Sequence, residues 1–274
     1  MCLVACLIAS REAARRFSFV LASNRDEFFG RPAAPLAWWQ SAPDAPWLLG
    51  GRDLSAGGTW LGLRRDGHLA LVTNVREPGR FDGNAPSRGE LVASWLAAPN
   101  FDASALQALA EVPRNGFNLL LARLHDGQAA WVGNRPAATR ALTPGLWGVS
   151  NAALDTPWPK VRCLKSRLAR AIAAAEACGG ADDIVRDAFL ALADATPADD
   201  AELPSTGVPL ERERQLSSAF IRIGTPAAYG TRCSTVIVAE RASDHTRVRV
   251  CERRFGIDGL VEGESVESFE LTPA

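Results

Sequence analysis

The order of the predicted elements constrains the fold of this chain more than any other feature of its sequence. Short apolar runs typical of strands come first, two strong helical patterns occupy residues 159–177 and 182–193, and strand-like runs return at 233–240 and 247–254. A parallel doubly wound sheet requires strands and helices that alternate, which this order does not provide. The order therefore favours an α+β fold with two mainly antiparallel sheets and helices packed outside them, in one domain over residues 1–274.

The first two apolar runs have the pattern of an antiparallel hairpin. Residues 3–9 and 17–22 are apolar and partly β-branched, and the polar segment SREAARR separates them. Period two places Cys2, Val4, Cys6 and Ile8 on one face of the first strand and Leu3, Ala5 and Leu7 on the other. Both faces are apolar, so we expect this strand to lie inside the protein with both sides covered.

Two further hairpins and one helix are predicted before residue 134. The hairpins pair residues 59–64 with 68–73 and residues 117–124 with 128–133, through Asp-Gly turns. Between them, Ser87 followed by Glu90 matches a helix N-terminus and predicts a helix at Arg88–Ala97. Residues 31–47, rich in Pro and Trp, are expected to form a loop, and residues 194–215 are expected to be the least ordered stretch.

Composition excludes several classes of partner. The formal net charge of -1 gives no field that could bind nucleic acid or an anionic membrane in bulk. No window approaches the roughly 20 apolar residues of a membrane span, and the short apolar start lacks the basic segment of a secretory signal. The six cysteines form no Cys-x-x-Cys pair, which indicates a reducing compartment. We therefore expect a cytoplasmic protein.

No metal site is predicted. The three histidines, His68, His125 and His245, each fall at or next to a turn and supply no plausible zinc ligand set. The chain has no Cys-x-x-Cys-His sequence for attached haem. The segment GGRDLSAGGTW lacks the Gly-Lys-Ser/Thr end of a phosphate-binding loop, so its glycines are interpreted as turn residues.

The cysteine at position 2 stands out by its place in the chain. Removal of Met1 by a methionine aminopeptidase would give Cys2 both a thiol and a free α-amine. An α-amine titrates near 7.7–8 and a thiol near 8.5, so one residue could serve as nucleophile and as its own general base. The alternative is that Cys2 is simply the first core residue of the first strand.

Polar residues at strand ends could complete such a site. Asn24, Arg25, Asp26 and Glu27 follow the second strand, and the hairpin brings them beside Cys2. Asn74 and Asn151 stand at or near other strand ends, where a side-chain amide can donate to a developing oxyanion. The alternatives are an exposed charged turn for residues 24–27 and plain turn residues for the two asparagines.

Several motifs in one order resemble a known family. They are MC at the start, ASNRDEFFGRP, GGTWLGL, ALVTNVREP, SRGELV, NGFNLL, GNRP, TPGLWGVSNAALDTPWPK and YGTRCSTVIV, and they extend from residue 1 to about 255. Together they are similar to the NRDE family, the transport and Golgi organisation protein 2 group. The resemblance implies a four-layer αββα N-terminal-nucleophile hydrolase fold, with two stacked sheets between helical layers and no required cofactor.

The opening also resembles, more distantly, the cysteine amidases that cleave bile-salt and penicillin amides. Those enzymes have Cys after Met and an Arg-Asn-x-Asp segment on the next strand. Asp26 matches their aspartate, whereas Ser23 stands where they have arginine, with Arg25 close by. Asn74 and Asn151 resemble their two asparagines near the oxyanion. Arg232 stands where a late arginine approaches the nucleophile.

The resemblance implies two possible functions. The first is hydrolysis of an acyl amide or thioester with Cys2, Asp26, Asn74, Asn151 and Arg232 as catalytic residues. Asn24, Arg25, Glu27 and Trp60 are then expected to bind substrate. The alternative is a non-catalytic protein that binds haem or a lipid such as acyl-CoA with the same fold. In both cases the expected partner is a small acyl or haem-like molecule, and the sequence predicts no particular oligomeric state.

Overall fold

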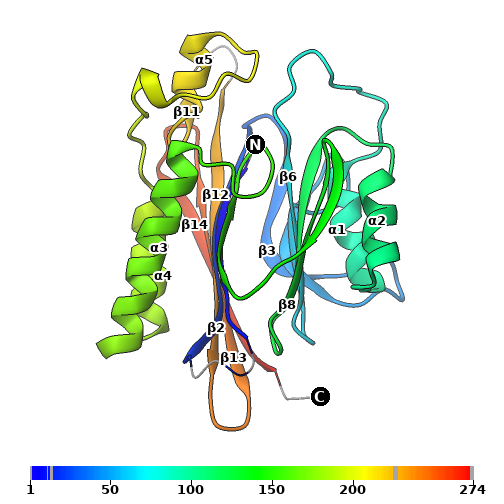
Figure 1. The fold of residues 1–274 in the computed structure, drawn as a ribbon, viewed down its shortest axis with the longest axis vertical. Coiled ribbons are helices and arrows are strands. Elements are labelled where there is room, and N and C mark those ends of the chain that lie inside the picture. Colours follow the sequence, from blue (N-terminus) through cyan, green and yellow to red (C-terminus); the bar gives the residue numbers. More distant parts are fainter. Residues whose placement is uncertain (1, 11, 13–14, 225–227, 272–274) are drawn as a thin grey trace.

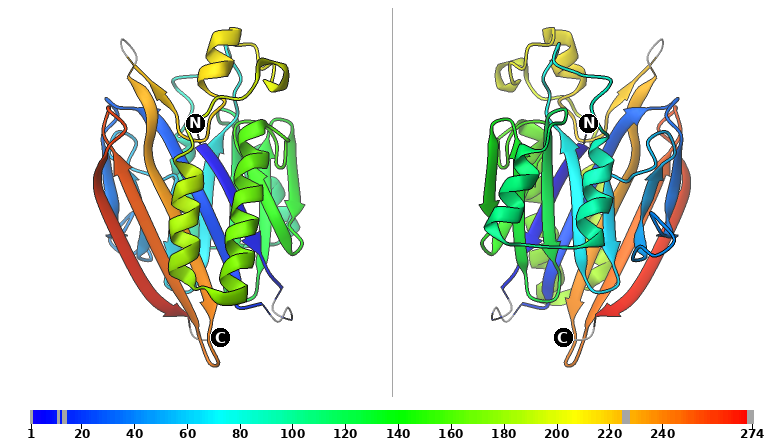
Figure 2. Two further views of the ribbon diagram at one scale, coloured as in Figure 1. Left: turned by 90° about the vertical axis from the view of Figure 1, so that its left-hand side faces the viewer. Right: turned by 90° about the vertical axis from the view of Figure 1, so that its right-hand side faces the viewer.

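Two antiparallel sheets face each other at the centre of the computed structural model, which describes residues 2–10, 12, 15–224 and 228–271 (Figure 1). The first sheet has the order β10–β1–β2–β12–β13–β14, with β11 paired to β12, and the second runs consecutively from β3 to β9. Helices α3 and α4 cover the outer face of the first sheet, and α1 and α2 cover the outer face of the second (Figure 2). The expected four-layer αββα architecture is confirmed.

The first sheet joins the two ends of the chain. Its central strands come from the N-terminal hairpin and from the C-terminal segment, so β2 pairs with β12 across more than 200 residues of sequence. Its strands are β1 (Cys2–Ile8), β2 (Phe17–Phe28), β10 (Gly145–Val149), β11 (Arg222–Ile223), β12 (Tyr229–Arg241), β13 (Thr246–Phe255) and β14 (Val261–Leu271).

The second sheet is built from one continuous stretch of chain. Its strands are β3 (Ala33–Trp39), β4 (Leu48–Asp53), β5 (Leu61–Arg64), β6 (His68–Asn74), β7 (Phe117–Arg123), β8 (Gln128–Asn134) and β9 (Ala137–Ala141). Pairs β5–β6 and β7–β8 are the two hairpins that the Asp-Gly turns predict, and both predictions are confirmed.

The helices lie close to their predicted positions. Ser87 is the N-cap of the helix predicted at residues 88–97, and its hydroxyl accepts a hydrogen bond from the Gly89 N–H. The helices are α1 (Arg88–Ala97), α2 (Ala103–Glu111), α3 (Pro159–Cys178), α4 (Ala181–Leu192), α5 (Leu210–Gln215) and the 3-10 helix η1 (Asp200–Glu202). Of these, α2, α5 and η1 were not expected.

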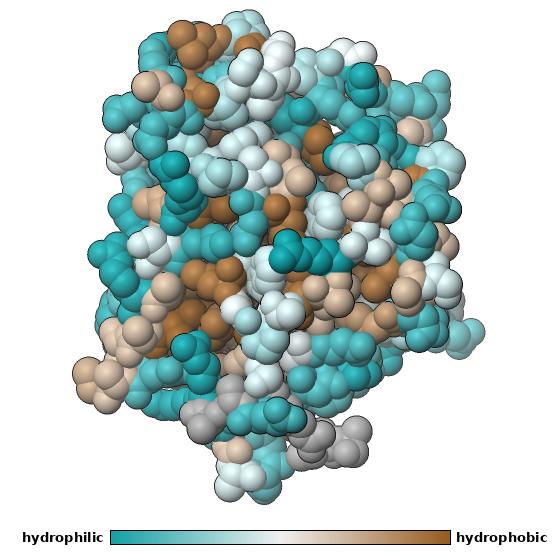
Figure 3. Space-filling model, in the orientation of Figure 1, coloured by the Kyte–Doolittle hydropathy of each residue, from teal (hydrophilic) through white to brown (hydrophobic). Residues whose placement is uncertain are grey.

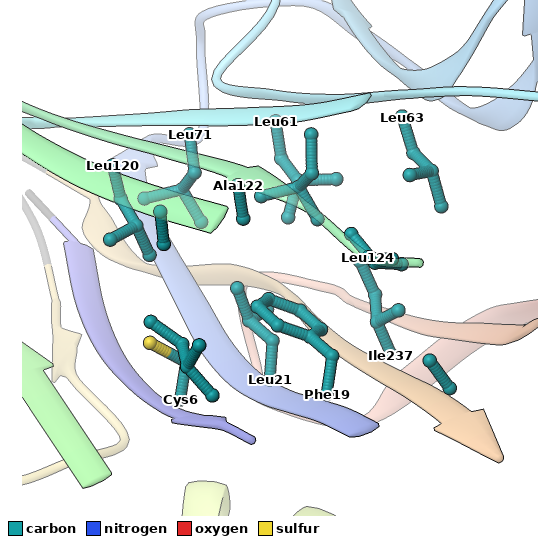
Figure 4. Packing of buried hydrophobic residues seen from close by; sticks show 14 of the residues in the cluster. Cys6, Phe19, Leu21, Leu61, Leu63, Leu71, Leu120, Ala122, Leu124 and Ile237 are labelled. Carbon is teal, nitrogen blue, oxygen red and sulfur yellow. The ribbon is translucent and has the colours of Figure 1, made fainter. Parts of the chain in front are cut away.

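Strand β1 is covered on both faces, as its period-two pattern predicts. Every residue of β1 is buried. Val4, Cys6 and Ile8 belong to the hydrophobic core between the two sheets. Figure 4 shows Cys6 in this core together with Leu71 and Leu120 of the opposite sheet. Leu3 and its face neighbours pack instead against α3 and α4. Because burial of a leucine side chain stabilises the fold by roughly 1.5–3 kcal/mol, packing on both faces holds β1 in its place between the second sheet and the helices α3 and α4.

Two sequence-based expectations about irregular segments are wrong. Residues 33–39, part of the predicted Pro- and Trp-rich loop, form strand β3. It lies at a sheet edge with a bulge between Ala34 and Ala37, an arrangement that accommodates Pro35 because an edge strand tolerates a missing N–H. Residues 194–215, expected to be the least ordered stretch, contain η1 and α5, which an ion pair between Arg214 and Asp200 joins at 2.6 Å.

The surface in Figure 3 mixes hydrophilic and hydrophobic residues over the whole of the face shown. Brown patches are interrupted by teal ones on this face. Within the described residues, none of the helices is both long enough and apolar enough to cross a membrane.

Candidate active site

A cavity of about 700 Å³ opens at the end of the sandwich where β1 begins and where β2 and β6 end. In Figure 1 this is the upper end of the molecule, which also carries α5. Besides the three strand ends, the cavity is lined by the loop between β6 and α1 and by residues around α5. The volume falls in the ordinary range of small-molecule sites, about 300–1,000 Å³.

Cys2 lies in the wall of this cavity. Its Cα is paired with that of Arg25 in the antiparallel register of β1 and β2, and its carbonyl accepts a hydrogen bond from Ser150 Oγ at 2.9 Å. The residue is 8% exposed, and burial raises the pKa of its thiol. The thiol is therefore protonated near neutral pH, and a reaction at the sulfur requires a base. Met1 lies outside the described residues.

Asp26 lies at the same end of the cavity and is 1% exposed. Its Oδ1 accepts a hydrogen bond from Thr231 Oγ1 at 2.7 Å, and its main-chain carbonyl accepts one from Tyr229 at 3.0 Å. Burial raises the pKa of this carboxyl, while the charge of Lys160 and the Thr231 hydroxyl oppose the shift. The carboxylate is thus fixed in direction within a low-dielectric environment.

Asn74 and Asn151 have different positions. Asn74, at the end of β6, lines the cavity. Asn151 is 1% exposed, and its Nδ2 donates to the Asn74 carbonyl at 2.9 Å and to Asn74 Oδ1 at 3.1 Å. Asn151 therefore acts on the cavity indirectly, by holding Asn74. Of the two asparagines, Asn74 is the one whose side chain could donate to a ligand there.

Of the four expected substrate-binding residues, three line the cavity and one does not. Arg25, Glu27 and Trp60 line the cavity, with the Arg25 guanidinium 4.2 Å from the centre of the Trp60 ring. Asn24 is fully buried on the other face of β2, because neighbouring residues of a strand point to opposite sides. Its amide donates to the carbonyls of Leu192 and Ala219 at 2.9 and 2.8 Å, which ties β2 to the outer layer.

Arg232 lies at a bulge in β12, between Thr231, which pairs with Asp26, and Cys233, which pairs with Arg25. Its Nη1 donates to the carbonyls of Phe28 and Arg31, both at 3.0 Å, and Phe29 supplies a third acceptor at 3.3 Å. The guanidinium is thus bound to the end of β2 and to the loop that follows it, and Arg232 is not among the described residues that line the cavity.

Comparison with known proteins agrees with the motifs. The family model described as Transport and Golgi organisation 2 matches residues 1–256. The chain belongs to this family.

Animal relatives confirm the assignment. The Transport and Golgi organization protein 2 homolog of Bos taurus is 36% identical over 241 residues, which cover 82% of this chain and 83% of that protein. The homolog of Homo sapiens is 33% identical over 242 residues, with the same two coverages.

Solved structures that are similar to this chain have much lower sequence identity than the animal relatives. A Caenorhabditis elegans N-acylethanolamine-hydrolyzing acid amidase ortholog has 10% sequence identity and a TM-score of 0.45, covering 86% of this chain and 92% of that one. Penicillin V acylase from Agrobacterium tumefaciens has 11% identity and a TM-score of 0.43, covering 93% of each chain.

Two glycine motifs of the family member meet beside the cavity. Gly57 has a φ of +76°, which confirms its expected turn role. Gly58 has a different role, which is to allow close packing. A Cβ at that position would lie 2.6 Å from the carbonyl carbon of Gly89. The GGTW segment and the first turn of α1 are therefore in direct backbone contact, and this contact places Arg88 at the cavity.

Sequence reasoning missed several charged residues of this family member's site. Arg31 donates to Asp53 at 2.7 Å in the cavity wall. Lys160 is 5% exposed, donates to the Leu216 carbonyl at 2.9 Å and carries a pKa that burial lowers to about 8. Arg88 lines the cavity from the first turn of α1. Each of the three lies in one of the family motifs, Arg31 in ASNRDEFFGRP, Arg88 in SRGELV and Lys160 at the end of TPGLWGVSNAALDTPWPK.

Proposed function

We propose that this family member is a cysteine N-terminal-nucleophile hydrolase that transfers the acyl group of an amide or thioester to water. The observation that carries the proposal is the position of Cys2. It begins a strand buried on both faces and lies in the wall of a cavity that Asp26 and Asn74 also line. A nucleophile, a carboxylate and an amide donor in one cavity are the groups that acyl transfer requires.

The first half of the reaction forms an acyl-enzyme. After removal of Met1, the α-amine of Cys2 takes the thiol proton, and the sulfur attacks the carbonyl carbon. The tetrahedral intermediate collapses as the bond to the leaving nitrogen or sulfur breaks, and the ammonium returns the proton to that leaving atom. The raised pKa of the buried thiol makes such a local base necessary, because few thiolates exist without one.

The second half restores the enzyme. Water attacks the thioester carbon, the amine accepts a proton from that water, and the carbon–sulfur bond breaks to release the acid. The thiolate then recovers the proton from the ammonium. Asp26 orients the ammonium in both halves, and Thr231 in turn holds the carboxylate at 2.7 Å.

Asn74 supplies the oxyanion donor in this proposal. Because its Oδ1 accepts from Asn151, its own Nδ2 is directed away from that contact and is available to a ligand in the cavity. A preorganised donor of this kind stabilises the charge that develops on the carbonyl oxygen.

Three measurements test the proposal. Intact mass shows whether Met1 is removed, and a native protein that retains it contradicts the mechanism. A panel of fatty acyl amides and acyl thioesters is then assayed with wild type, Cys2→Ala and Cys163→Ala, the last being an exposed cysteine outside the cavity. Turnover by wild type and Cys163→Ala but not by Cys2→Ala supports the proposal, as does an acyl adduct on Cys2. Equal background rates for all three contradict it.

Non-catalytic binding of an acyl-CoA or haem-like ligand is the alternative proposal. It is supported by the cavity volume of about 700 Å³ and by the aromatic residues in its wall, Phe28, Trp60, Phe81 and Tyr229. Phe28 and Phe81 are 50% and 74% exposed, so an apolar ligand would cover surface that now faces solvent. Saturable binding of haem or acyl-CoA by wild type and Cys2→Ala alike, without turnover, would favour this alternative.

A further inference from the structure

The cavity is lined by arginines and by an equal number of acidic residues, namely Asp26, Glu27, Asp53, Glu77 and Asp82. Arg31 forms an ion pair with Asp53 at 2.7 Å, and Arg76 forms one with buried Glu213 at 2.5 Å. Five arginines line the cavity, namely Arg25, Arg31, Arg76, Arg88 and Arg212. The two that concern the reacting sulfur are Arg25 and Arg88.

Arg25 has a buried donor that no described residue satisfies. The residue is 5% exposed, and its Nη1 has no hydrogen-bond partner among the described residues. Its Nη2 lies 3.7 Å from Asp53 Oδ2 and 4.0 Å from Glu27 Oε2, distances beyond hydrogen bonding. Trp60 stacks against the guanidinium and holds its plane. An unpaired buried donor is costly, and Arg25 lines the cavity, so Nη1 is a candidate donor for an acceptor that binds there.

The position of Arg25 fixes where that acceptor would lie. Arg25 is directly opposite Cys2 in the pairing of β1 and β2, and side chains of paired residues project from the same face of a sheet. An acceptor bound to Arg25 Nη1 therefore lies on the face of the sheet from which the Cys2 side chain projects.

Arg88 provides a second donor from helix α1, which covers the outer face of the opposite sheet. Its Nη1 donates to the Gly116 carbonyl at 3.2 Å, and no described carboxylate forms an ion pair with it. Burial lowers the pKa of Arg88, and the charges of Cys2, Glu27 and Glu77 oppose that shift. Arg88 and Cys2 line the same cavity. Ser87 and Gly89, at the positive end of α1, line the cavity beside it.

We propose that Arg25 and Arg88 together bind a carboxylate of the substrate that lies within a few bonds of the scissile carbonyl. This deepens the proposed function and rests on it. The substrate class is then an acyl compound with a carboxylate next to the reacting bond, such as an N-acyl amino acid. Two planar guanidinium groups suit a carboxylate, because each presents paired N–H donors to its two oxygens.

The geometry distinguishes this class from acyl-CoA thioesters. The phosphates of coenzyme A are many bonds away from the thioester carbonyl, whereas Arg25 is paired with the nucleophile itself. A ligand that reaches Arg25 and Arg88 with its phosphates could not at the same time present its thioester to Cys2.

Three octanoyl substrates test the proposal. N-octanoylglycine carries the carboxylate, N-octanoylglycinamide is its neutral match, and octanoyl-CoA carries distant phosphates. Wild type is expected to have the highest kcat/KM for N-octanoylglycine. Arg88→Gln should lower that value about 10- to 100-fold and change the glycinamide value less than about threefold, since a charge-assisted hydrogen bond is lost only with the anion. Arg88→Lys should recover part of the loss, and Arg140→Gln, on β9, is the matched control.

Binding to Cys2→Ala separates failure of this proposal from failure of the proposed function. If wild type turns over none of the three compounds, their dissociation constants for Cys2→Ala are measured by calorimetry. Tighter binding of N-octanoylglycine than of the glycinamide, removed by Arg88→Gln in the same background, supports the carboxylate site without catalysis. Equal binding of the two, or an Arg88→Gln loss confined to octanoyl-CoA, overturns it. Circular dichroism establishes that each variant is folded.

Discussion

The side-chain amide of Asn151 holds the side chain of Asn74 in one orientation. Its Nδ2 donates to both the main-chain carbonyl and Oδ1 of Asn74, at 2.9 and 3.1 Å. Asn151 Oδ1 lies 3.1 Å from Ser150 Oγ, whose hydroxyl also lies 2.9 Å from the Cys2 carbonyl. Asn74, the proposed oxyanion donor, and Cys2, the proposed nucleophile, are thus linked by hydrogen bonds through the buried side chains of Asn151 and Ser150.

This link predicts unequal but coupled effects for the two asparagines. Asn74→Ala removes the donor and should lower kcat about 10²- to 10³-fold. Asn151→Ala leaves the donor but frees its orientation, so the loss should be smaller. The double variant should be no slower than Asn74→Ala, because Asn151 acts through Asn74. Single-turnover rates measure all three, and fully additive losses would show that Asn151 acts independently.

Thr231 should set the acid limb of the pH profile. Its hydroxyl donates to Asp26 Oδ1 at 2.7 Å and lowers the pKa of a carboxyl that burial raises. Thr231→Val removes this donor and raises the pKa of Asp26 further. If the carboxylate is the active form, loss of kcat/KM on acidification should begin at a higher pH in the variant. Thr235→Val makes the same change on β12 away from Asp26, and an equal displacement in that control would contradict the assignment.

The local parts of the fold could be predicted from the sequence because they depend on periodicity. The alternating faces of β1, the Asp-Gly hairpins and the Ser87 cap each depend on the types and spacing of a few neighbouring residues. Strand β14 was missed because it is an edge strand rich in Glu and Ser, with few of the β-branched residues that signal strands. Strand β3 was missed because proline is more typical of loops than of strands, so Pro35 led to the prediction of a loop.

The site was predictable only where its residues follow strands in order. Cys2, Asp26 and Asn74 stand at strand ends that an antiparallel arrangement brings together, and the structure places all three in the cavity wall. Arg88 lines the cavity from α1, and Lys160 on α3 acts on Asp26 through its charge. The positions of these helices depend on contacts between segments distant in sequence, such as Gly58 against Gly89, and local sequence patterns do not predict such contacts.

Lys160 should make stability depend on pH in a defined window. Burial lowers its pKa from the ordinary 10.5 to about 8, so between these values the unfolded chain binds a proton that the folded chain does not. Stability conferred by this group therefore rises with pH through the window, by roughly 3 kcal/mol in all.

Urea denaturation of wild type and Lys160→Met from pH 7 to 11 measures this dependence. The difference between their unfolding free energies should move in favour of wild type as the pH rises above about 8. Because the buried cysteines titrate in both proteins, taking the difference removes their contribution. Lys165→Met, on the same helix with an ion pair to Asp155, is the control. A constant difference between wild type and Lys160→Met would contradict the lowered pKa.

The contact between Gly58 and Gly89 should couple the GGTW segment to ligand recognition. In Gly58→Ala the new Cβ would lie 2.6 Å from the Gly89 carbonyl carbon, and main-chain atoms cannot yield without displacing the first turn of α1. We expect a destabilisation of about 1–3 kcal/mol, as for other overpacked sites. Arg88 lies in that turn, so selectivity for N-octanoylglycine over its glycinamide should also fall. Gly30→Ala adds the same methyl group where no atom lies within 4 Å, and both unfolding free energy and selectivity should stay at the wild-type values. Loss of stability with unchanged selectivity in Gly58→Ala would show that the contact between Gly58 and Gly89 is not what places Arg88.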